Sequence, residues 1–130
     1  MEKPKYVPGD IIGGMFFYFY SESPNLPFFV GDLKKIHEAI FELRKSYPIL
    51  KSFPFSEKEV SHFSRLLESV LHRLQLSRII GMENPDFKRF IVKKPAVKYL
   101  EESIIPLFNE EEKQQLKKIG KEFLSRCGDL

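Results

Sequence analysis

The sequence predicts a mainly helical α+β domain with about four helices, a small antiparallel β-hairpin and a possible N-terminal strand. Apolar residues repeat at helical spacing over several long stretches. A turn signal, Asn84-Pro85-Asp86, separates two short runs rich in strand-forming residues. The length of 130 residues, 42% of them hydrophobic, suits a single domain with its own core.

Residues 1–31 form an aromatic-rich N-terminal segment. Its first residues, which include Pro4, Pro8 and Gly9, have a loop-like composition. Residues 15–20 are dense in aromatic side chains, which favour strands, so we expect a strand there. A short buried helix is the alternative, because periodicity cannot separate the two in so short a run.

The first clear helix is expected over residues 32–47. Asp32 follows a glycine and is a good N-cap. Pro48 disfavours helix at the residue before it and should end this element. The apolar residues that repeat at helical spacing are Leu33, Ile36, Ile40, Leu43 and Tyr47.

A second helix is expected over residues 56–76. The sequence Ser-Glu-Lys-Glu at 56–59 fits a capping box, in which Ser56 caps the helix and Glu59 reaches back to it. Phe55 and Val60 fit the hydrophobic staple that often closes the same turn.

This helix has two contrasting faces when successive residues are placed 100° apart. The apolar face should pack on the core and consists of Val60, Phe63, Leu67, Val70, Leu71 and Leu74. The opposite face contains no acidic residue, since Glu57, Glu59 and Glu68 fall on the flanks. Its polar and basic side chains are those of Lys58, His62, Arg65, Ser69, His72 and Arg73. An anionic partner could bind there.

A hairpin should follow, with strands near Ser77–Met82 and Phe87–Val92 around the Asn84-Pro85-Asp86 turn. The alternation of a strand then places Arg89 on one side of the sheet and Phe90 on the other. Two helices close the chain. The first should begin at Pro95 and run to Ile105, and the second should follow the N-cap Asn109 and end at Gly128.

The net charge of +3 is spread unevenly along the chain. Residues 1–30 carry a net charge of −1, residues 31–100 carry +6 and residues 101–130 carry −2. We therefore divide the single domain, residues 1–130, into the N-terminal segment, a basic core over residues 32–100 and a C-terminal helical extension over residues 101–130. A normal solvated surface is the alternative explanation of the basic centre.

Catalytic and cofactor motifs are lacking in the sequence. The three histidines His37, His62 and His72 do not have the spacing of a metal site. Cys127 lies on the apolar stripe of the last helix and is expected to be a buried thiol. No glycine-rich phosphate loop or nucleophile elbow occurs. We therefore expect a protein that is not an enzyme and has no metal and no cofactor.

The location that these features favour is the cytoplasm. A single cysteine excludes an internal disulfide and suits a reducing compartment. The N-terminus does not have the pattern of a signal peptide, and the longest apolar run is far shorter than a membrane span. Lys and Glu are plentiful while Asn and Gln are scarce, a composition seen in thermophiles but also produced by AT-rich genomes.

A helix followed by a basic hairpin resembles the winged-helix superfamily, over roughly residues 32–100. The resemblance implies a winged-helix-like domain that binds duplex DNA and regulates transcription. The helix would read base edges, with Arg65 and Ser69 as candidates, and the lysines would contact phosphates. On the hairpin wing, the resemblance selects Lys88, Arg89, Lys93 and Lys94.

One departure from the winged-helix pattern is the length of the expected helix, which leaves no turn between a short helix and the recognition helix. The segments Phe-Pro-Phe-Ser at 53–56, Arg-Leu-Gln-Leu-Ser at 73–77 and Asn-Pro-Asp-Phe at 84–87 also resemble small phage-associated or toxin–antitoxin-associated domains of the Panacea type. That resemblance implies an antitoxin-like regulator.

The alternative function is a protein-interaction or self-association module, including a homodimer. It would use the aromatic residues 15–20 together with Phe28 and Phe29. An exposed aromatic patch would support this function, whereas burial of these residues in the core would remove its basis.

Overall fold

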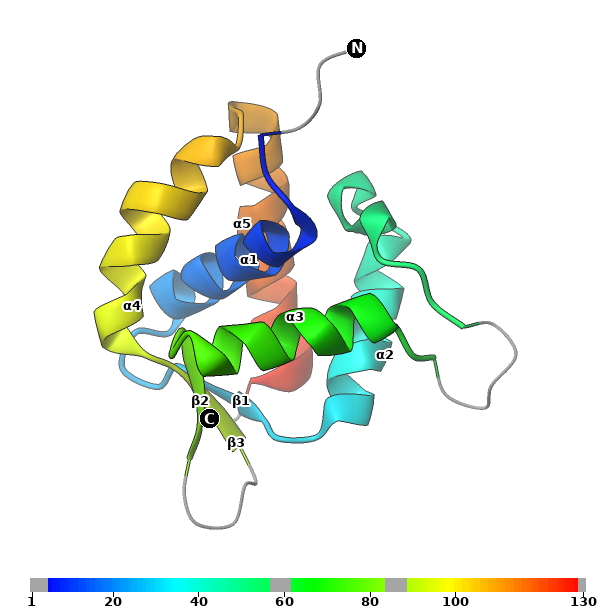
Figure 1. The fold of residues 1–130 in the computed structure, drawn as a ribbon, viewed down its shortest axis with the longest axis horizontal. Coiled ribbons are helices and arrows are strands. Elements are labelled where there is room, and N and C mark those ends of the chain that lie inside the picture. The colour runs from blue at the N-terminus through cyan, green and yellow to red at the C-terminus, as the bar shows by residue number, and fades with distance from the viewer. Residues whose placement is uncertain (1–4, 57–61, 84–88, 129–130) are drawn as a thin grey trace.

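The computed structural model describes residues 5–56, 62–83 and 89–128. It confirms the expected mainly helical α+β domain with a small antiparallel hairpin (Figure 1). In chain order the elements are α1 (Pro8–Glu22), β1 (Phe28–Val30), α2 (Leu33–Arg44), a 3-10 helix (Pro48–Ser52), α3 (Arg65–Leu76), β2 (Ile80–Glu83), β3 (Arg89–Val92), α4 (Lys94–Tyr99), a π-helical turn (Leu100–Ile104), a second 3-10 turn (Ile105–Leu107) and α5 (Glu110–Cys127).

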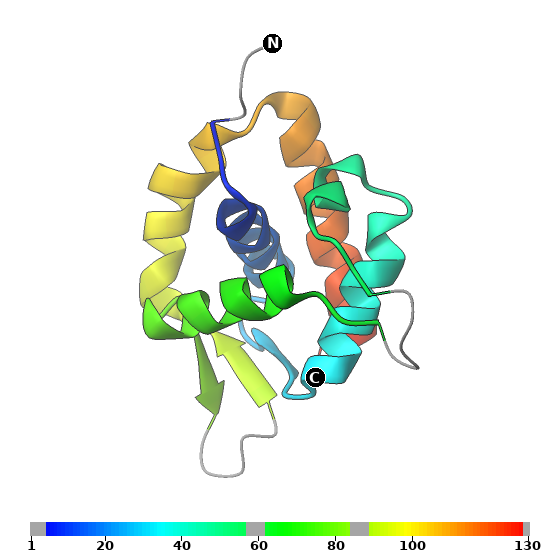
Figure 2. The same ribbon diagram turned by 45° about the vertical axis from the view of Figure 1, so that its right-hand side comes forward.

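Helix α1 lies in the middle of the other helices and contains the segment expected to be a strand (Figure 2). The predicted strand over residues 15–20 is therefore wrong, and the alternative of a buried helix is correct. Ile12, Phe16 and Phe19 are completely buried, and the neighbouring aromatic side chains also pack on the core. A helix covered by neighbours on several sides is apolar nearly all round, which removes the helical period from its sequence.

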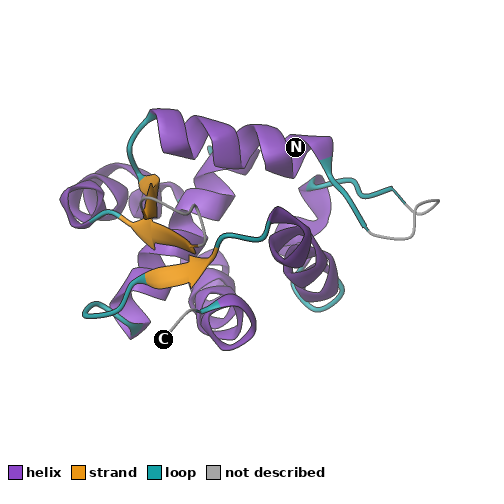
Figure 3. Ribbon diagram, turned by 90° about the horizontal axis from the view of Figure 1, so that it is seen from below, coloured by secondary structure: helices purple, strands orange, loops and turns teal. Residues whose placement is uncertain are grey.

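The three strands form one antiparallel sheet with the order β1-β3-β2 (Figure 3). In the predicted hairpin, Gly81 pairs with Ile91 and Met82 pairs with Phe90. The turn at residues 84–86 lies outside the described residues. Strand β1 was not predicted, because three residues carry too little pattern to recognise. It pairs with β3 and brings Phe29 opposite Phe90.

Helix α3 begins at Arg65 and not at Ser56. Ser56 is in the connector, where its backbone N–H donates to the carbonyl oxygen of Phe63 at 2.9 Å. The N-cap is Ser64, whose buried hydroxyl accepts from the backbone N–H of Leu67 at 3.2 Å. The predicted cap at Ser56 is wrong. Its partners in the expected box and staple, Glu59 and Val60, lie outside the described residues, as does Lys58.

Tertiary contacts explain why Ser64, and not Ser56, caps α3: Ser64 is buried and the residue before it packs on α2. The ring of Phe63 stacks on His37 of α2 with centroids 4.7 Å apart, so the residue before the cap is fixed against a neighbouring helix. The inward face of α3 agrees with the prediction, since Leu67, Val70, Leu71 and Leu74 are buried. Phe63 was assigned to the same face of the helix, but it lies in the connector before α3 and packs on His37 from there.

Phenylalanine side chains link the helices to the sheet. The ring of Phe29 lies 4.9 Å from Phe16, 5.1 Å from Phe90 and 5.5 Å from Phe123. All four side chains are buried, and they come from β1, α1, β3 and α5. Aromatic pairs at these distances contribute about 0.5–1.5 kcal/mol each beyond their burial.

The backbones of α1 and α5 approach each other closely at Gly120. A Cβ atom at this position would lie 2.9 Å from the backbone nitrogen of Phe19 and 3.0 Å from the carbonyl oxygen of Met15. Neither of these backbone atoms can move without shifting α1. Glycine at position 120 therefore sets how near α5 lies to the central helix.

The end of α3 has the geometry of a Schellman motif. The N–H of Ile79 donates to the carbonyl of Leu74 at 2.9 Å, and the N–H of Arg78 donates to the carbonyl of Gln75 at 3.0 Å. This motif places Arg78 in the left-handed region with φ of 62°. Glycine is usual there, because a residue with a Cβ atom pays about 1–2 kcal/mol in this conformation.

The C-terminal helices agree largely with the prediction. Helix α4 begins at Lys94, one residue before the expected Pro95, and helical turns continue past Pro106. Asn109 caps α5 as expected and forms a capping box with Glu112, in which both hydrogen bonds measure 2.8 Å. The buried stripe of α5 consists of Leu116, Ile119, Phe123 and Cys127.

Gly120→Ala should lower the free energy of unfolding by about 1–3 kcal/mol, because the new methyl group overpacks the contact between α1 and α5. Gly9→Ala is the matched control. A Cβ atom at Gly9 meets no atom within 4 Å, so this change in α1 should raise stability by up to about 1 kcal/mol. Urea denaturation of both variants measures the difference. Equal stability of Gly120→Ala and the unmodified protein would contradict the close approach.

Candidate nucleic-acid interface

Four of the residues predicted to bind nucleic acid lie together on the outward face of α3. Arg65, Ser69, His72 and Arg73 are all exposed on this 12-residue helix. The buried residues of the inward face hold α3 on the core, so these side chains point away from it. The helix lies against α1, with the hairpin next to its C-terminal end (Figure 1).

A groove of about 670 Å³ lies beside this face of α3. Helix α3 contributes the polar side of the groove with Arg65, Glu68, Ser69, His72 and Gln75. The apolar side comes from α2, the connector, α3 and the two hairpin strands: Leu33, Phe63, Leu71, Met82 and Phe90. The structure therefore brings α3 and the hairpin together around one concave surface.

Two groove residues, Glu68 and Gln75, were not part of the polar and basic face predicted from the sequence. Glu68 was placed on a flank, but it is exposed and lines the same groove as Arg65 and His72. The face is therefore mixed in charge and not purely basic. Gln75 was missed, although its position three residues after His72 is the signal that places it on the same side of a helix.

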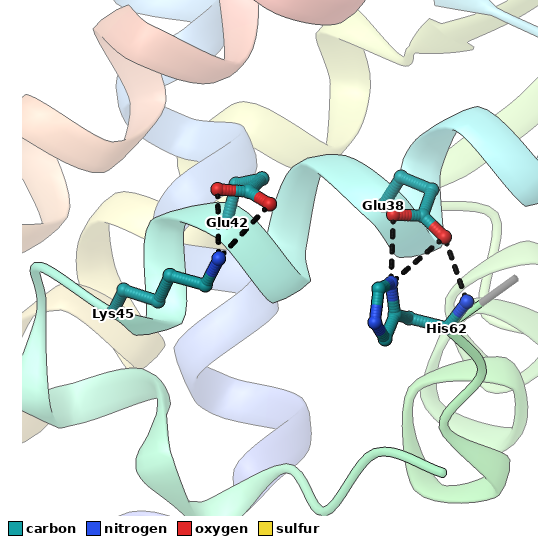
Figure 4. Close-up of polar contacts among 4 residues, drawn as sticks. All are labelled: Glu38, Glu42, Lys45 and His62. Carbon is teal, nitrogen blue, oxygen red and sulfur yellow. Dashed lines mark hydrogen bonds and ion pairs between the residues drawn. The ribbon is translucent and has the colours of Figure 1, made fainter. Parts of the chain in front are cut away.

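His62 does not belong to the face of α3. It lies in the connector, where its backbone N–H donates to Oε1 of Glu38 at 2.7 Å (Figure 4). Its Nδ1 lies 3.1 and 3.0 Å from the two carboxylate oxygens, and its ring stacks on Phe41 with centroids 3.6 Å apart. The hydrogen bonds from the ring and backbone of His62 lower the pKa of the Glu38 carboxyl. His62 thus fastens the connector to α2, just before α3 begins.

The predicted wing cations are dispersed. The guanidinium of Arg89 lies 3.9 Å from the centroid of the Phe28 ring, on the side of β3 opposite to the buried Phe90. The side chain of Lys93 is half-buried and passes next to Gly81 on β2. Lys94 is exposed at the start of α4. Lys88 lies outside the described residues. The hairpin strands therefore meet the groove through Met82 and Phe90, and not through their cations.

His37 lies beneath the connector and is 1% exposed. It is therefore a packing histidine of the core. Its ring contacts Phe63, and neither ring nitrogen has a hydrogen-bond partner among the residues that the structure describes. Burial lowers the pKa of His37, while the charges of Glu68 and Glu38 act in the opposite direction.

Metal and thiol chemistry receive no support from the described residues. Among residues 5–56, 62–83 and 89–128, no three His, Cys, Asp or Glu side chains come together as metal ligands. Cys127 is buried as predicted, and burial raises the pKa of its thiol to about 11. In the same ranges, no helix is both long enough and apolar enough to cross a membrane.

No family model, curated protein or solved structure matches this chain. Its function must therefore be argued from α3 and the groove beside it.

His37→Phe should stabilise the protein by about 1 kcal/mol at pH 7.5, because it removes two buried polar atoms that have no partner. The effect should grow as pH falls below 6.5. A histidine with a lowered pKa in the folded state takes up its proton first in the unfolded chain. His37 therefore adds no proton-linked cost well above 6.5 and destabilises the fold increasingly as pH falls below that value. Urea denaturation at pH 7.5 and 5.5 measures both effects. A variant with the same pH dependence as the unmodified protein would contradict this account of His37.

Proposed function

We propose that this protein binds duplex DNA and that α3 is its recognition helix. The observation that carries the proposal is the placement of α3, which is anchored by four buried apolar residues and presents its other face beside the hairpin. A helix of 12 residues is about 18 Å long. Such a helix fits the major groove of B-DNA, which is about 12 Å wide.

The side chains on α3 suit the reading of bases. Arg65 is placed to donate two hydrogen bonds to guanine, and Gln75 has the amide that pairs with adenine. Glu68, an apparent obstacle to binding an anion, can accept from the amino group of cytosine. Arg73 and His72 are exposed beside them and are assigned to the phosphates.

The arrangement of α3 and the hairpin supports a winged-helix mode of binding. In this mode the groove-lining strands approach the same DNA as α3. One departure concerns the connector, because residues 45–64 separate α2 from α3 where a helix-turn-helix has a turn of three or four residues. His62 compensates by tying the end of that connector to α2. It is a positioning residue in this proposal and not a DNA contact.

The resemblance of the sequence to winged-helix and antitoxin-like proteins suggests a cellular role for this DNA binding. A DNA-binding domain without catalytic groups would act as a transcription regulator in the cytoplasm, of the antitoxin-like kind that the sequence resembles. The alternative of an interaction module has less support, because Phe16, Phe19 and Phe29 of its aromatic surface are completely buried, although Phe17, Tyr18, Tyr20 and Phe28 are only half-buried.

Arg73→Gln should weaken binding to random-sequence duplex DNA about equally on all sequences. It should also flatten the slope of log K against log salt by about one unit, because one phosphate contact is lost. Fluorescence anisotropy with a labelled 24-base-pair duplex at several salt concentrations measures the slope. Lys117→Gln, which removes one exposed cation from α5, is the matched control and should leave the slope unchanged.

Arg65→Ala should act differently, since it removes a base contact. On a selected site it should cost about 1–3 kcal/mol of discrimination, with a smaller effect on random DNA. Binding that is undetectable at low ionic strength, or an equal loss for Lys117→Gln and Arg73→Gln, would contradict the assignment of α3.

A further inference from the structure

A second surface lies between the end of α3 and the start of α4. It is a cleft of about 350 Å³, lined by Ser77, Arg78, Ile79, Pro95, Ala96 and Tyr99. Most of this lining is apolar, and Arg78 supplies the charge. The large side chain of Tyr99 remains uncovered in this cleft, since it is 50% exposed.

Arg78 occupies a backbone position that glycine would fill with less strain. Its φ of 62° lies in the left-handed region, where a Cβ atom is unfavourable. The side chain is exposed and takes part in no ion pair within the described part of the chain. The fold therefore gains nothing from the guanidinium. Strain retained at an exposed charged residue beside a cleft points to a role in binding.

Among the lining residues, Arg78 is the one charged side chain, and none is acidic. The exposed Lys94 precedes the lining residue Pro95 in the chain, and the exposed Lys98 precedes Tyr99. An arginine binds a carboxylate with two parallel hydrogen bonds, and the apolar lining requires a hydrocarbon group close to that carboxylate.

We propose that this cleft binds an acidic peptide segment of a partner protein. A carboxylate of the segment pairs with Arg78, and a neighbouring leucine or phenylalanine side chain packs on Ile79, Ala96 and Tyr99. A nucleic-acid phosphate would also satisfy Arg78, but the deoxyribose beside it is more polar than a leucine or phenylalanine side chain and suits the apolar lining less well. The proposal is independent of the DNA interface, because none of the cleft residues lines the groove beside α3.

The test is an NMR titration of the full chain with the peptide acetyl-Asp-Leu-Asp-Phe-Asp-amide. We expect amide shifts at Ile79, Ala96 and Tyr99. The same peptide with Asn in place of Asp should bind at least about tenfold more weakly, as expected when a charge-assisted pair is lost. No shift at these amides, or equal binding of both peptides, would overturn the proposal.

Three variants at one position separate binding from stability. Arg78→Gly and Arg78→Asn should lose at least about tenfold in peptide affinity while raising Tm by about 3 °C, because both residues tolerate the left-handed conformation. Arg78→Lys keeps the charge and the strain but loses the paired hydrogen bonds, so its peptide affinity should fall between those of Arg78→Gly and the unmodified protein, at an unchanged Tm. A lower Tm for Arg78→Gly would overturn the inference that Arg78 is kept for binding.

Duplex DNA provides the remaining arm of the test. We expect random-sequence duplex to leave the cleft amides on α4, those of Ala96 and Tyr99, unshifted and to bind Arg78→Gly as tightly as the unmodified protein. DNA that displaces the peptide from the cleft would assign Arg78 to the nucleic-acid interface and would overturn the peptide site. Failure of DNA binding alone contradicts the function proposed for α3 and leaves the peptide result intact.

Discussion

The close contact between α1 and α5 is the constraint on which the other elements depend. Gly120 allows the backbone of α5 to lie against Phe19, and Phe123 on the same helix then reaches the ring of Phe29. Through Phe29 the contact continues into the sheet, and β2 follows directly from the end of α3. A shift of α5 would therefore be transmitted to the sheet and to the position of α3. The outer face of α3 is available for binding because its inner face is held by this chain of contacts.

Much of the fold was predictable because its signals are local. Asp32 and Asn109 cap their helices as expected, since a cap depends on a few neighbouring residues. The hairpin was predicted from its alternation and turn residues. The strand expected over residues 15–20 was wrong because α1 is covered on several sides, and this burial hides the helical period. Ser56 was preferred over Ser64 by its local capping pattern, whereas the burial of Ser64 and the stacking of Phe63 on His37 depend on the tertiary structure.

The same distinction applies to the candidate interface. Arg65, Ser69 and His72 were assigned to one exposed face, and helical geometry is sufficient to place them together. Arg89 could not be placed from the sequence, because its contact is Phe28 of the unpredicted strand β1. The groove and the cleft form only where α3 meets other elements, so Gln75 and Arg78 gain their importance from the fold. The left-handed conformation of Arg78 is hidden from sequence reasoning, which expects glycine at such a position.

We propose that α3 presents a binding face for duplex DNA, while its other face belongs to the core. The most direct measurement is an NMR titration of the ¹⁵N-labelled protein with a random-sequence duplex at low salt. We expect shifts at exposed positions of α3, including Arg65, Ser69 and His72, with little change along α5. Shifts that are absent from α3, or that concentrate on α5, would contradict it.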